Sequence, residues 1–348
     1  MDLLKKSSFI GCAVLFCVAA VAGARSGEAS LAEERAAASR RTPESSQQPA
    51  GSPAAAQAAQ LPQLAGGVVY TVSPSDADPE IKRFTADNVV LFNRGVAKNA
   101  NLLVYFSGTG GTPASGSLFL EVAAKAGYRV IGLEYDNATS VPQVCGPNPE
   151  PACSDRFRQK RVFGDDTTKD IDDLPAESIV NRLTKLLQYL DAHHHDEGWG
   201  RYLRDGKPDW PRIAFAGHSQ GGGHAAYIAK KEKVARVIVL SGAGDWVNAT
   251  KVFAPWVASP SATPPERWYA AYHQKESRAE ALKTACELLK IPPAHARVLT
   301  LEPNAPPAAN PGLDQYHGSM ISARTTPRDA QGNPAYAPDW AFFLGAAR

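Results

Sequence analysis

The stretch RIAFAGHSQGGGHAAYIAKK, residues 212–231, determines how the rest of the chain is organised. Residues 212–216 predict a short buried strand, and the alanine-rich sequence further on predicts a helix. Between the two, residues 217–221 read GHSQG and fit the pattern Gly-x-Ser-x-Gly. This order predicts a tight, strained turn that places the Ser219 hydroxyl at the end of a sheet, with helical N–H groups beside it. The two glycines give the backbone the space that such a turn needs.

The motif GHSQGG and its flanks give the chain a resemblance to the α/β-hydrolase superfamily. The longer run GHSQGGGHAA, followed by VARVIVLSGAGDW at 234–246, is similar to a group of secreted bacterial α/β hydrolases. The resemblance extends from about Val68 to the C-terminus. It implies an α/β-hydrolase fold and a triad of serine, acid and histidine in that chain order, but it implies no substrate.

The composition indicates one large folded domain without a polyanionic partner. The chain has 348 residues, of which 44% are hydrophobic, so it can bury a sizeable core. Its formal net charge is only +2, and no basic block stands out. We therefore expect neither nucleic acid nor an anionic membrane surface as a partner.

The N-terminal residues predict export. Residues 1–24 have the pattern of a signal peptide, with two lysines, an apolar run at 9–21 and small residues at the cleavage site. The apolar run is too short for a convincing transmembrane helix, so no stable membrane anchor is expected. Residues 25–66 carry few large apolar side chains and predict a disordered linker. We expect a secreted or periplasmic protein.

From residue 67 to residue 348, apolar strands alternate with helical patterns, which is typical of a mostly parallel, doubly wound sheet. Together with the resemblance, this pattern predicts an α/β-hydrolase domain over residues 67–348. The first two strands, near 67–73 and 88–93, are commonly antiparallel in this superfamily. The pattern breaks between residues 136 and 176, where a long loop at the carboxyl edge of the sheet predicts a cap over the site.

Three cysteines remain after removal of the predicted signal peptide. In an oxidising compartment, the close pair Cys145 and Cys153 predicts a disulfide that pins the cap loop. Cys286 lies in a helical pattern, and we expect an inert, unpaired thiol there.

Two clusters contain metal-binding residue types, but we expect no metal and no cofactor. The first is the histidine run at 193–195, whose consecutive side chains point in different directions. The second is a set of cap-loop aspartates, whose oxygens could bind calcium although their spacing matches no EF-hand loop. These aspartates are Asp165, Asp166, Asp170, Asp172 and Asp173. Solvated loop charges explain them better.

The implied triad needs a histidine after the last strand, which we expect at 296–303. His317 is the only histidine downstream of that strand, so it is the predicted base. His218 and His224 lie close to Ser219 in sequence. A side chain next to such a tight turn cannot readily reach the serine hydroxyl, which favours packing roles for both.

Four carboxylates compete for the acid of the triad: Asp245, Glu276, Glu302 and Asp314. Counting strands favours Glu276, which directly follows the predicted strand at 267–273. Asp245 is the alternative, because some members of the superfamily carry the acid one strand earlier.

A tetrahedral intermediate needs two converging N–H donors. The first is predicted to be the backbone N–H of Gln220, directly after the nucleophile. The second should come from the glycine-rich loop after the strand at 102–106, and we assign it to Thr109.

These residues predict a secreted serine hydrolase, most simply a carboxylesterase that cleaves a small-molecule or polymeric ester through an acyl-enzyme on Ser219. Two other functions stay open. The same triad serves serine peptidases, and an α/β-hydrolase scaffold can also form a non-catalytic binding module.

Overall fold

The computed structural model describes residues 60–97, 99–304 and 314–346, which belong to one unit of the chain, Gln57–Arg348. The predicted signal peptide lies outside the described residues, and so does the predicted linker up to residue 59. None of the described helices is both long enough and apolar enough to cross a membrane.

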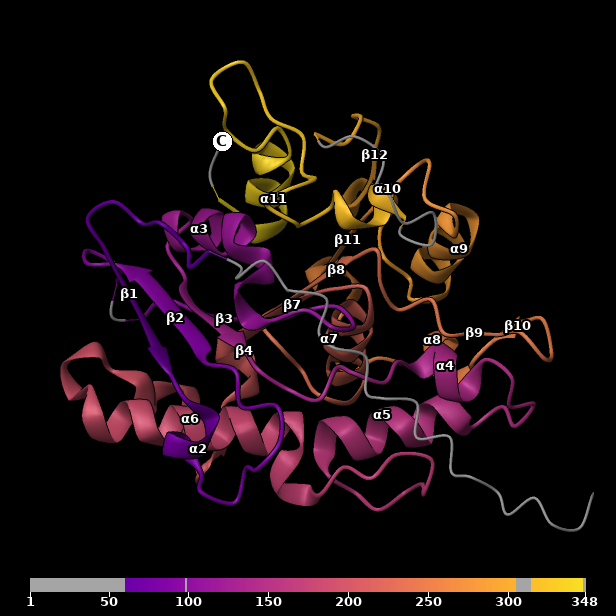
Figure 1. The fold of residues 1–348 in the computed structure, drawn as a ribbon, viewed down its shortest axis with the longest axis horizontal. Helices are drawn as coiled ribbons and strands as arrows, with labels where there is room; N and C mark the ends of the chain where they lie inside the picture. Colours follow the sequence, from indigo (N-terminus) through magenta and orange to yellow (C-terminus); the bar gives the residue numbers. More distant parts are fainter. Residues whose placement is uncertain (1–59, 98, 305–313, 347–348) are drawn as a thin grey trace, which may run out of the picture. The chain divides into compact units, whose positions relative to one another are not determined.

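Eight strands form one sheet in the order β1-β2-β4-β3-β7-β8-β11-β12 (Figure 1). Their bounds are β1 (Gly67–Val72), β2 (Asn88–Asn93), β3 (Leu102–Phe106), β4 (Arg129–Leu133), β7 (Ile213–His218), β8 (Arg236–Leu240), β11 (Trp268–His273) and β12 (Ala296–Leu299). The pairs β1–β2 and β2–β4 are antiparallel, and the other five pairs are parallel. This topology confirms the predicted α/β-hydrolase fold, including its antiparallel start.

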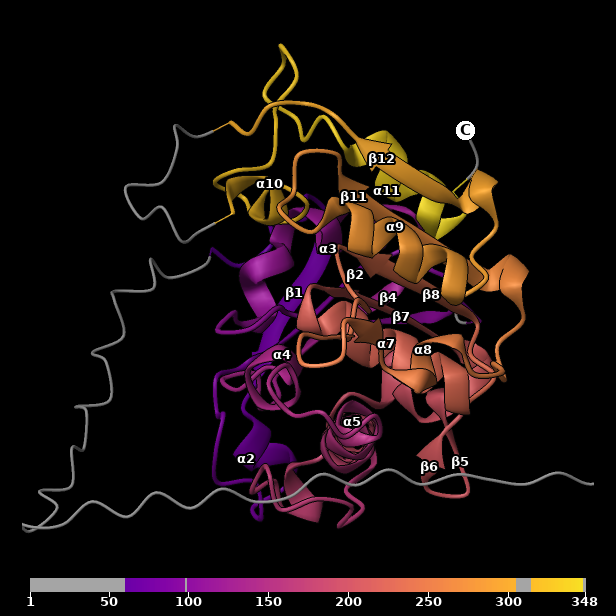
Figure 2. The same ribbon diagram turned by 90° about the vertical axis from the view of Figure 1, so that its right-hand side faces the viewer.

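Helices cover both faces of this sheet, as Figures 1 and 2 show. Helices α3 (Ser117–Lys125) and α11 (Ala337–Leu344) pack on one face, and α6 (Ile179–His193) and α7 (Gln220–Lys231) pack on the other. Strand β3 is buried throughout, and its residues alternate between the two cores. A strand covered on both faces needs apolar residues at every position, which explains the continuous run LLVYF.

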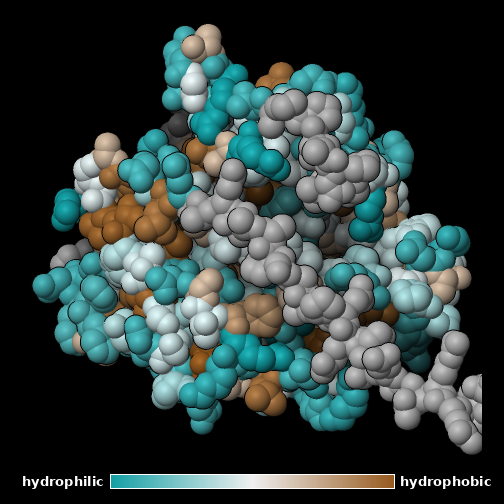
Figure 3. All heavy atoms as spheres, in the orientation of Figure 1, coloured by the Kyte–Doolittle hydropathy of each residue, from teal (hydrophilic) through white to brown (hydrophobic). Residues whose placement is uncertain are grey.

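The remaining elements are short and connect these layers. The helices are α2 (Pro74–Ala77), α4 (Val141–Cys145), α5 (Cys153–Phe163), α8 (Pro255–Ala258), α9 (Ala279–Leu288) and α10 (Gln315–Gly318). Two hairpins are formed by β5 (Leu203–Arg204) with β6 (Lys207–Pro208), and by β9 (Trp246–Val247) with β10 (Val252–Phe253). Strand β1 forms one edge of the eight-stranded sheet and is mostly half-buried. Figure 3 shows apolar side chains gathered around β1 and α3.

The cap segment, residues 136–176, contains helices α4 and α5 where the sequence predicts a loop. Helix α5 lacks an apolar period because part of its buried side is charged, including Arg158, Lys160 and Arg161. These charges are paired inside the protein: the Arg161 Nε donates to Asp173 at 2.8 Å. Buried charges are tolerated when they are paired in this way, so polar sequence can conceal a packed helix.

The disulfide between Cys145 and Cys153 is confirmed, and it joins the end of α4 to the start of α5. Cys286 is the free cysteine among the described residues, and it is half-buried in α9. Burial raises the pKa of its thiol to about 12, so the thiol stays protonated and unreactive at neutral pH.

Removing this disulfide should destabilise the fold. Replacing Cys145 and Cys153 together with serine should lower the free energy of unfolding by roughly 2–3 kcal/mol, because the short closed loop gains freedom in the unfolded chain. Urea denaturation without reductant measures the change, and Cys286→Ser serves as the control that should leave stability nearly unchanged. Equal stability of the double variant and the unchanged protein would contradict the prediction.

Candidate active site

Ser219 lies in a strained turn between β7 and α7. Its φ is 55° and its ψ is −121°, a conformation that residues other than glycine seldom adopt. The Ser219 N–H donates to the carbonyl oxygen of Leu240 at 2.8 Å, which ties the turn to β8. A Cβ at Gly217 would overlap the backbone of Gly221, and a Cβ at Gly221 would overlap the backbone of Phe106. Neither glycine of the motif can therefore be replaced by a residue with a side chain unless the neighbouring backbone moves.

The third and fourth glycines of the run have different neighbours. Gly222 approaches the backbones of Gly217 and Gly242, as expected for close packing of the helix on the sheet. Gly223 instead faces the cap, where a Cβ would collide with the guanidinium group of Arg158. The space that Gly223 leaves is therefore filled by a side chain of α5.

The structure brings Glu276 and His317 together. Glu276 follows β11 at the carboxyl edge of the sheet, and His317 lies in α10. The His317 Nδ1–H donates to the Glu276 carboxylate at 2.8 Å. The other carboxylate oxygen accepts from the Ser241 hydroxyl at 2.6 Å and from the His273 N–H at 2.7 Å. Glu276 is buried, so these bonds hold its carboxylate firmly toward the histidine.

The other three carboxylates have different partners. Both oxygens of Asp245 bind Arg158, each at 2.6 Å, and the Trp256 Nε1–H also donates to it at 2.8 Å. Glu302 is exposed and pairs with Lys275. Asp314 caps α10, and its Oδ1 accepts from the N–H groups of Tyr316 and His317, both at 3.1 Å. Asp314 thus orients the helix that carries His317, a role that the sequence analysis did not foresee.

The glycine-rich loop after β3 approaches the nucleophile closely. A Cβ at Gly108 would lie 3.2 Å from the Cβ of Ser219. The segment after β4 holds this loop, because Asn137 donates to the Ser107 hydroxyl at 2.9 Å and to the Gly111 carbonyl at 2.7 Å. Within the described part of the chain, the backbone N–H groups of Thr109 and Gln220 have no hydrogen-bond acceptor. Both amides are therefore free to bind a negatively charged oxygen.

All five predicted site residues line one cavity of about 210 Å³: Thr109, Ser219, Gln220, Glu276 and His317. The cap contributes Ser140, Pro142 and Arg158 to the same wall. Among the described residues no hydrogen bond joins the Ser219 hydroxyl to His317. In enzymes without substrate such contacts are often long and tighten when substrate binds.

His218 makes a contact that the sequence analysis missed. Its Nε2–H donates to the backbone carbonyl of His317 at 2.9 Å, and the two rings lie 4.6 Å apart. Burial, followed by the nearby His317, lowers the pKa of His218 to about 3, so its ring is neutral at pH 7. His224 is buried too, with its ring edge-on to Tyr135 and its Nδ1 3.2 Å from Arg158. Both histidines have packing contacts, as predicted, and His218 also supports the segment that carries His317.

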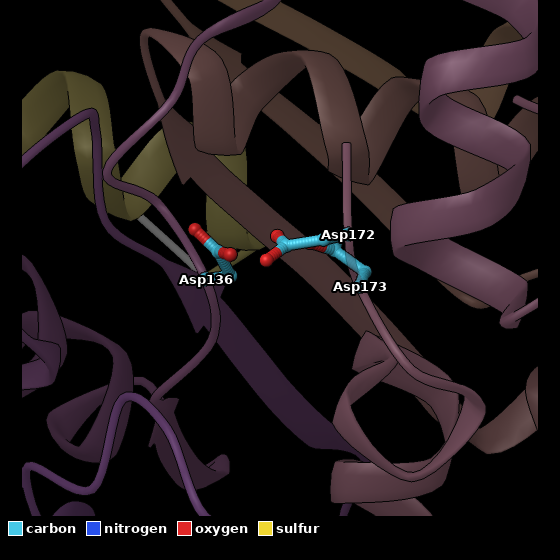
Figure 4. Close-up of side chains that lie close together, drawn as sticks. All are labelled: Asp136, Asp172 and Asp173. Atoms are coloured by element: carbon cyan, nitrogen blue, oxygen red, sulfur yellow. The ribbon is translucent and has the colours of Figure 1, made fainter. Parts of the chain in front are cut away.

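The acidic cluster of the cap contains two guanidinium groups. Figure 4 shows Asp136, Asp172 and Asp173, whose carboxylates lie close together. Arg83 pairs with Asp136 at 3.3 Å and with Asp172 at 2.9 Å, and Arg161 pairs with Asp173 at 2.8 Å. Each of the three carboxylates is therefore paired with a guanidinium group.

The histidine run at 193–195 does not converge on a common point. His193 stacks on Tyr189 at 4.1 Å, whereas His194 stacks on Tyr70 of β1 at 4.7 Å. The rings of His193 and His194 are thus engaged by different aromatic neighbours, which is the arrangement expected for consecutive residues at a helix end.

No protein-family model matches the chain, and no curated protein matches it either. Solved structures similar to the chain include a hormone-sensitive lipase from a metagenome library, with 14% identity and a TM-score of 0.45 over 92% of this chain and 98% of that chain. A bacterial heroin esterase has 16% identity and a TM-score of 0.40 over 81% and 85%. Esterase B from Lactobacillus rhamnosis, inhibited by a tributyrin phosphonate, has 14% identity and a TM-score of 0.43 over 92% and 97%. Similarities this low carry no argument about function.

The buried pair of Arg158 and Asp245 predicts a structural role for Asp245. Asp245→Asn should lower the free energy of unfolding by about 3–5 kcal/mol, because it leaves a buried guanidinium without its carboxylate. The control is Asp87→Asn, which removes an exposed carboxylate and should change stability by less than about 1 kcal/mol. Urea denaturation followed by circular dichroism distinguishes the two. An Asp245→Asn variant of unchanged stability would contradict the structural role.

Proposed function

We propose that this protein is a serine hydrolase that cleaves carboxylic esters through an acyl-enzyme. The observation that carries the proposal is the Glu276–His317 hydrogen bond, which lies in the same cavity as Ser219 on its strained turn. A carboxylate that accepts the Nδ1–H of histidine leaves the Nε2 as an acceptor for the proton of a serine hydroxyl. The arrangement therefore supports nucleophilic catalysis by Ser219.

In the proposed first step, the Ser219 Oγ attacks the ester carbonyl carbon while the His317 Nε2 takes the hydroxyl proton. The carbonyl oxygen becomes negatively charged and accepts hydrogen bonds from the N–H groups of Gln220 and Thr109. Glu276 stabilises the imidazolium that forms. Collapse of the tetrahedral intermediate breaks the bond to the alcohol, which leaves with the proton that His317 carried.

In the second step water replaces the alcohol. His317 takes a proton from the water, whose oxygen attacks the acyl carbon on Ser219. The second tetrahedral intermediate uses the same two N–H donors, and its collapse releases the carboxylic acid and restores the serine hydroxyl. Neither step requires a metal or an organic cofactor, because the two donors and the imidazole carry all the charge that develops.

We also propose that the protein acts outside the cytoplasm, as a secreted or periplasmic enzyme. The signal-peptide pattern of residues 1–24 supports this location. The disulfide between Cys145 and Cys153 is further support, because such bonds persist mainly in oxidising compartments.

A fluorophosphonate probe tests the nucleophile. The unchanged protein should be labelled on one serine and should hydrolyse p-nitrophenyl butyrate, whereas Ser219→Ala should lose both properties. Ser241→Ala would be a poor control because Ser241 contacts Glu276, so Ser322→Ala is used instead. Labelling that survives in Ser219→Ala, or a folded unchanged protein that is not labelled, would reject the proposal. Cleavage of the matching p-nitroanilide would point to a peptidase.

The acid of the triad is tested by Glu276→Gln. This variant should fold and bind substrate but should show a kcat lower by about 10³–10⁴-fold, because an amide neither stabilises the imidazolium nor selects the correct tautomer. The control is Glu302→Gln, an exposed carboxylate that is bound to Lys275 and should leave turnover unchanged. Near-normal turnover by Glu276→Gln would remove Glu276 from the triad.

A further inference from the structure

A larger cleft adjoins the cavity at Ser219. It has a volume of about 1140 Å³ and is lined by residues of α9, the β9–β10 hairpin and α8. Figure 1 shows where these elements lie in the fold. Four residues line both spaces: Pro142, Glu276, Ser277 and Arg278. The cleft and the cavity therefore meet beside the Glu276–His317 pair, within reach of the reacting atoms.

The wall of the cleft presents apolar side chains to solvent. Trp246 and Phe253 pack edge to face at 5.3 Å on the hairpin, and Val252 beside them is 52% exposed. The facing helix α9 contributes Ala281 and Leu288. Apolar surface in a concave site is the usual lining of a pocket for an apolar ligand, since the ligand removes that surface from water.

Contacts at its base hold the hairpin wall in place. Asp245, directly before β9, is fixed by the buried Arg158. The Ala254 N–H donates to the Asp245 carbonyl at 2.8 Å, and the Ala249 N–H donates to the Gly146 carbonyl at 3.2 Å. Gly146 lies in the short loop that the disulfide closes. The cleft is therefore formed before any ligand binds, which reduces the entropy lost on binding.

We propose that this cleft binds a long apolar substituent of an ester, either its acyl chain or its alcohol, and that the other substituent of the ester is short. This proposal rests on the proposed hydrolase function. The cavity of about 210 Å³ at Ser219 accepts only a small group, whereas the cleft is larger than the roughly 300–1,000 Å³ typical of small-molecule pockets. An alkyl or aryl-alkyl group in the cleft buries apolar surface in the transition state, so the substrate class is an asymmetric ester with one extended apolar substituent.

Two series of esters test the proposal and identify which side of the ester enters the cleft. The acyl series consists of p-nitrophenyl acetate, butyrate, octanoate and laurate, and the alcohol series consists of acetates of ethanol, butanol, octanol and dodecanol. In one of the two series, kcat/KM should rise at least about tenfold from the shortest to the longest member. A flat or falling profile in both series would overturn the proposal.

Substitutions in the wall of the cleft test whether the cleft causes the preference for long esters. Ala281→Trp narrows the cleft and should reduce the preference for the long ester while short esters react as before. Lys283→Trp on the same helix is the control outside the cleft. Val252→Ser should lower kcat/KM for the long ester by about fivefold or more. Its control is Val298→Ser, because Val298 is 51% exposed and lies on β12, away from the cleft. An undiminished preference in Ala281→Trp would contradict the assignment.

A binding measurement separates this proposal from the proposed function. Calorimetry with laurate and with dodecanol should detect binding of at least one of them to Ser219→Ala, and Ala281→Trp in that background should weaken the binding at least about tenfold. Acetate should not bind detectably. If the protein hydrolyses short esters but binds neither long compound, the cleft proposal fails alone. If it binds one of them but is not labelled by a fluorophosphonate, the hydrolase proposal fails alone.

Discussion

The backbone turn at Ser219 is the constraint on which the arrangement of this domain depends. Its positive φ reverses the chain between β7 and α7 within one residue, and Gly217 and Gly221 permit the contacts that follow. Gly221 lies against the end of β3, so the loop that carries Thr109 is brought beside the nucleophile. The strained conformation is held because β7 is buried throughout and α7 is buried from Gln220 to Lys230. The same packing positions both amides that would bind an oxyanion.

The buried ion pair of Arg158 and Asp245 connects three parts of the molecule around that turn. Arg158 comes from cap helix α5, lies over Gly223 of α7, and binds Asp245 at the base of the β9–β10 hairpin. Both oxygens of Asp245 are used in this contact. Asp245, the alternative acid, is therefore occupied by its contacts with Arg158. Glu276 is the buried carboxylate that faces His317.

Much of the fold follows from the sequence because its signals are local. The strand, turn and helix around Ser219 are specified by apolar residues and glycines within twenty positions, and the alternating pattern elsewhere predicts the main strands. Counting strands also selects Glu276, since only its place after β11 brings it to the carboxyl edge beside His317. These features need no knowledge of distant contacts.

The features that escaped prediction depend on long-range pairing of polar groups. Helix α5 is buried through arginines whose carboxylates lie elsewhere in the chain, so no apolar period marks it. The contact of His218 with the His317 carbonyl joins two segments that sequence patterns do not relate. The Oδ2 of Asp314 likewise accepts from the N–H of Ser277, 37 residues away in the sequence. The hairpin that borders the large cleft has only two residues in each strand, too few to give a periodic signal.

A crystal structure of the protein after reaction with a phosphonate ester tests directly whether Ser219 is the nucleophile. The proposed mechanism predicts a covalent bond from the phosphorus to the Ser219 Oγ. It also predicts that one phosphonate oxygen accepts from the N–H groups of Thr109 and Gln220 at about 2.7–3.1 Å, with the His317 Nε2 beside the bonded oxygen. Phosphorus on another residue, or a phosphonate oxygen that faces away from both amides, would contradict it.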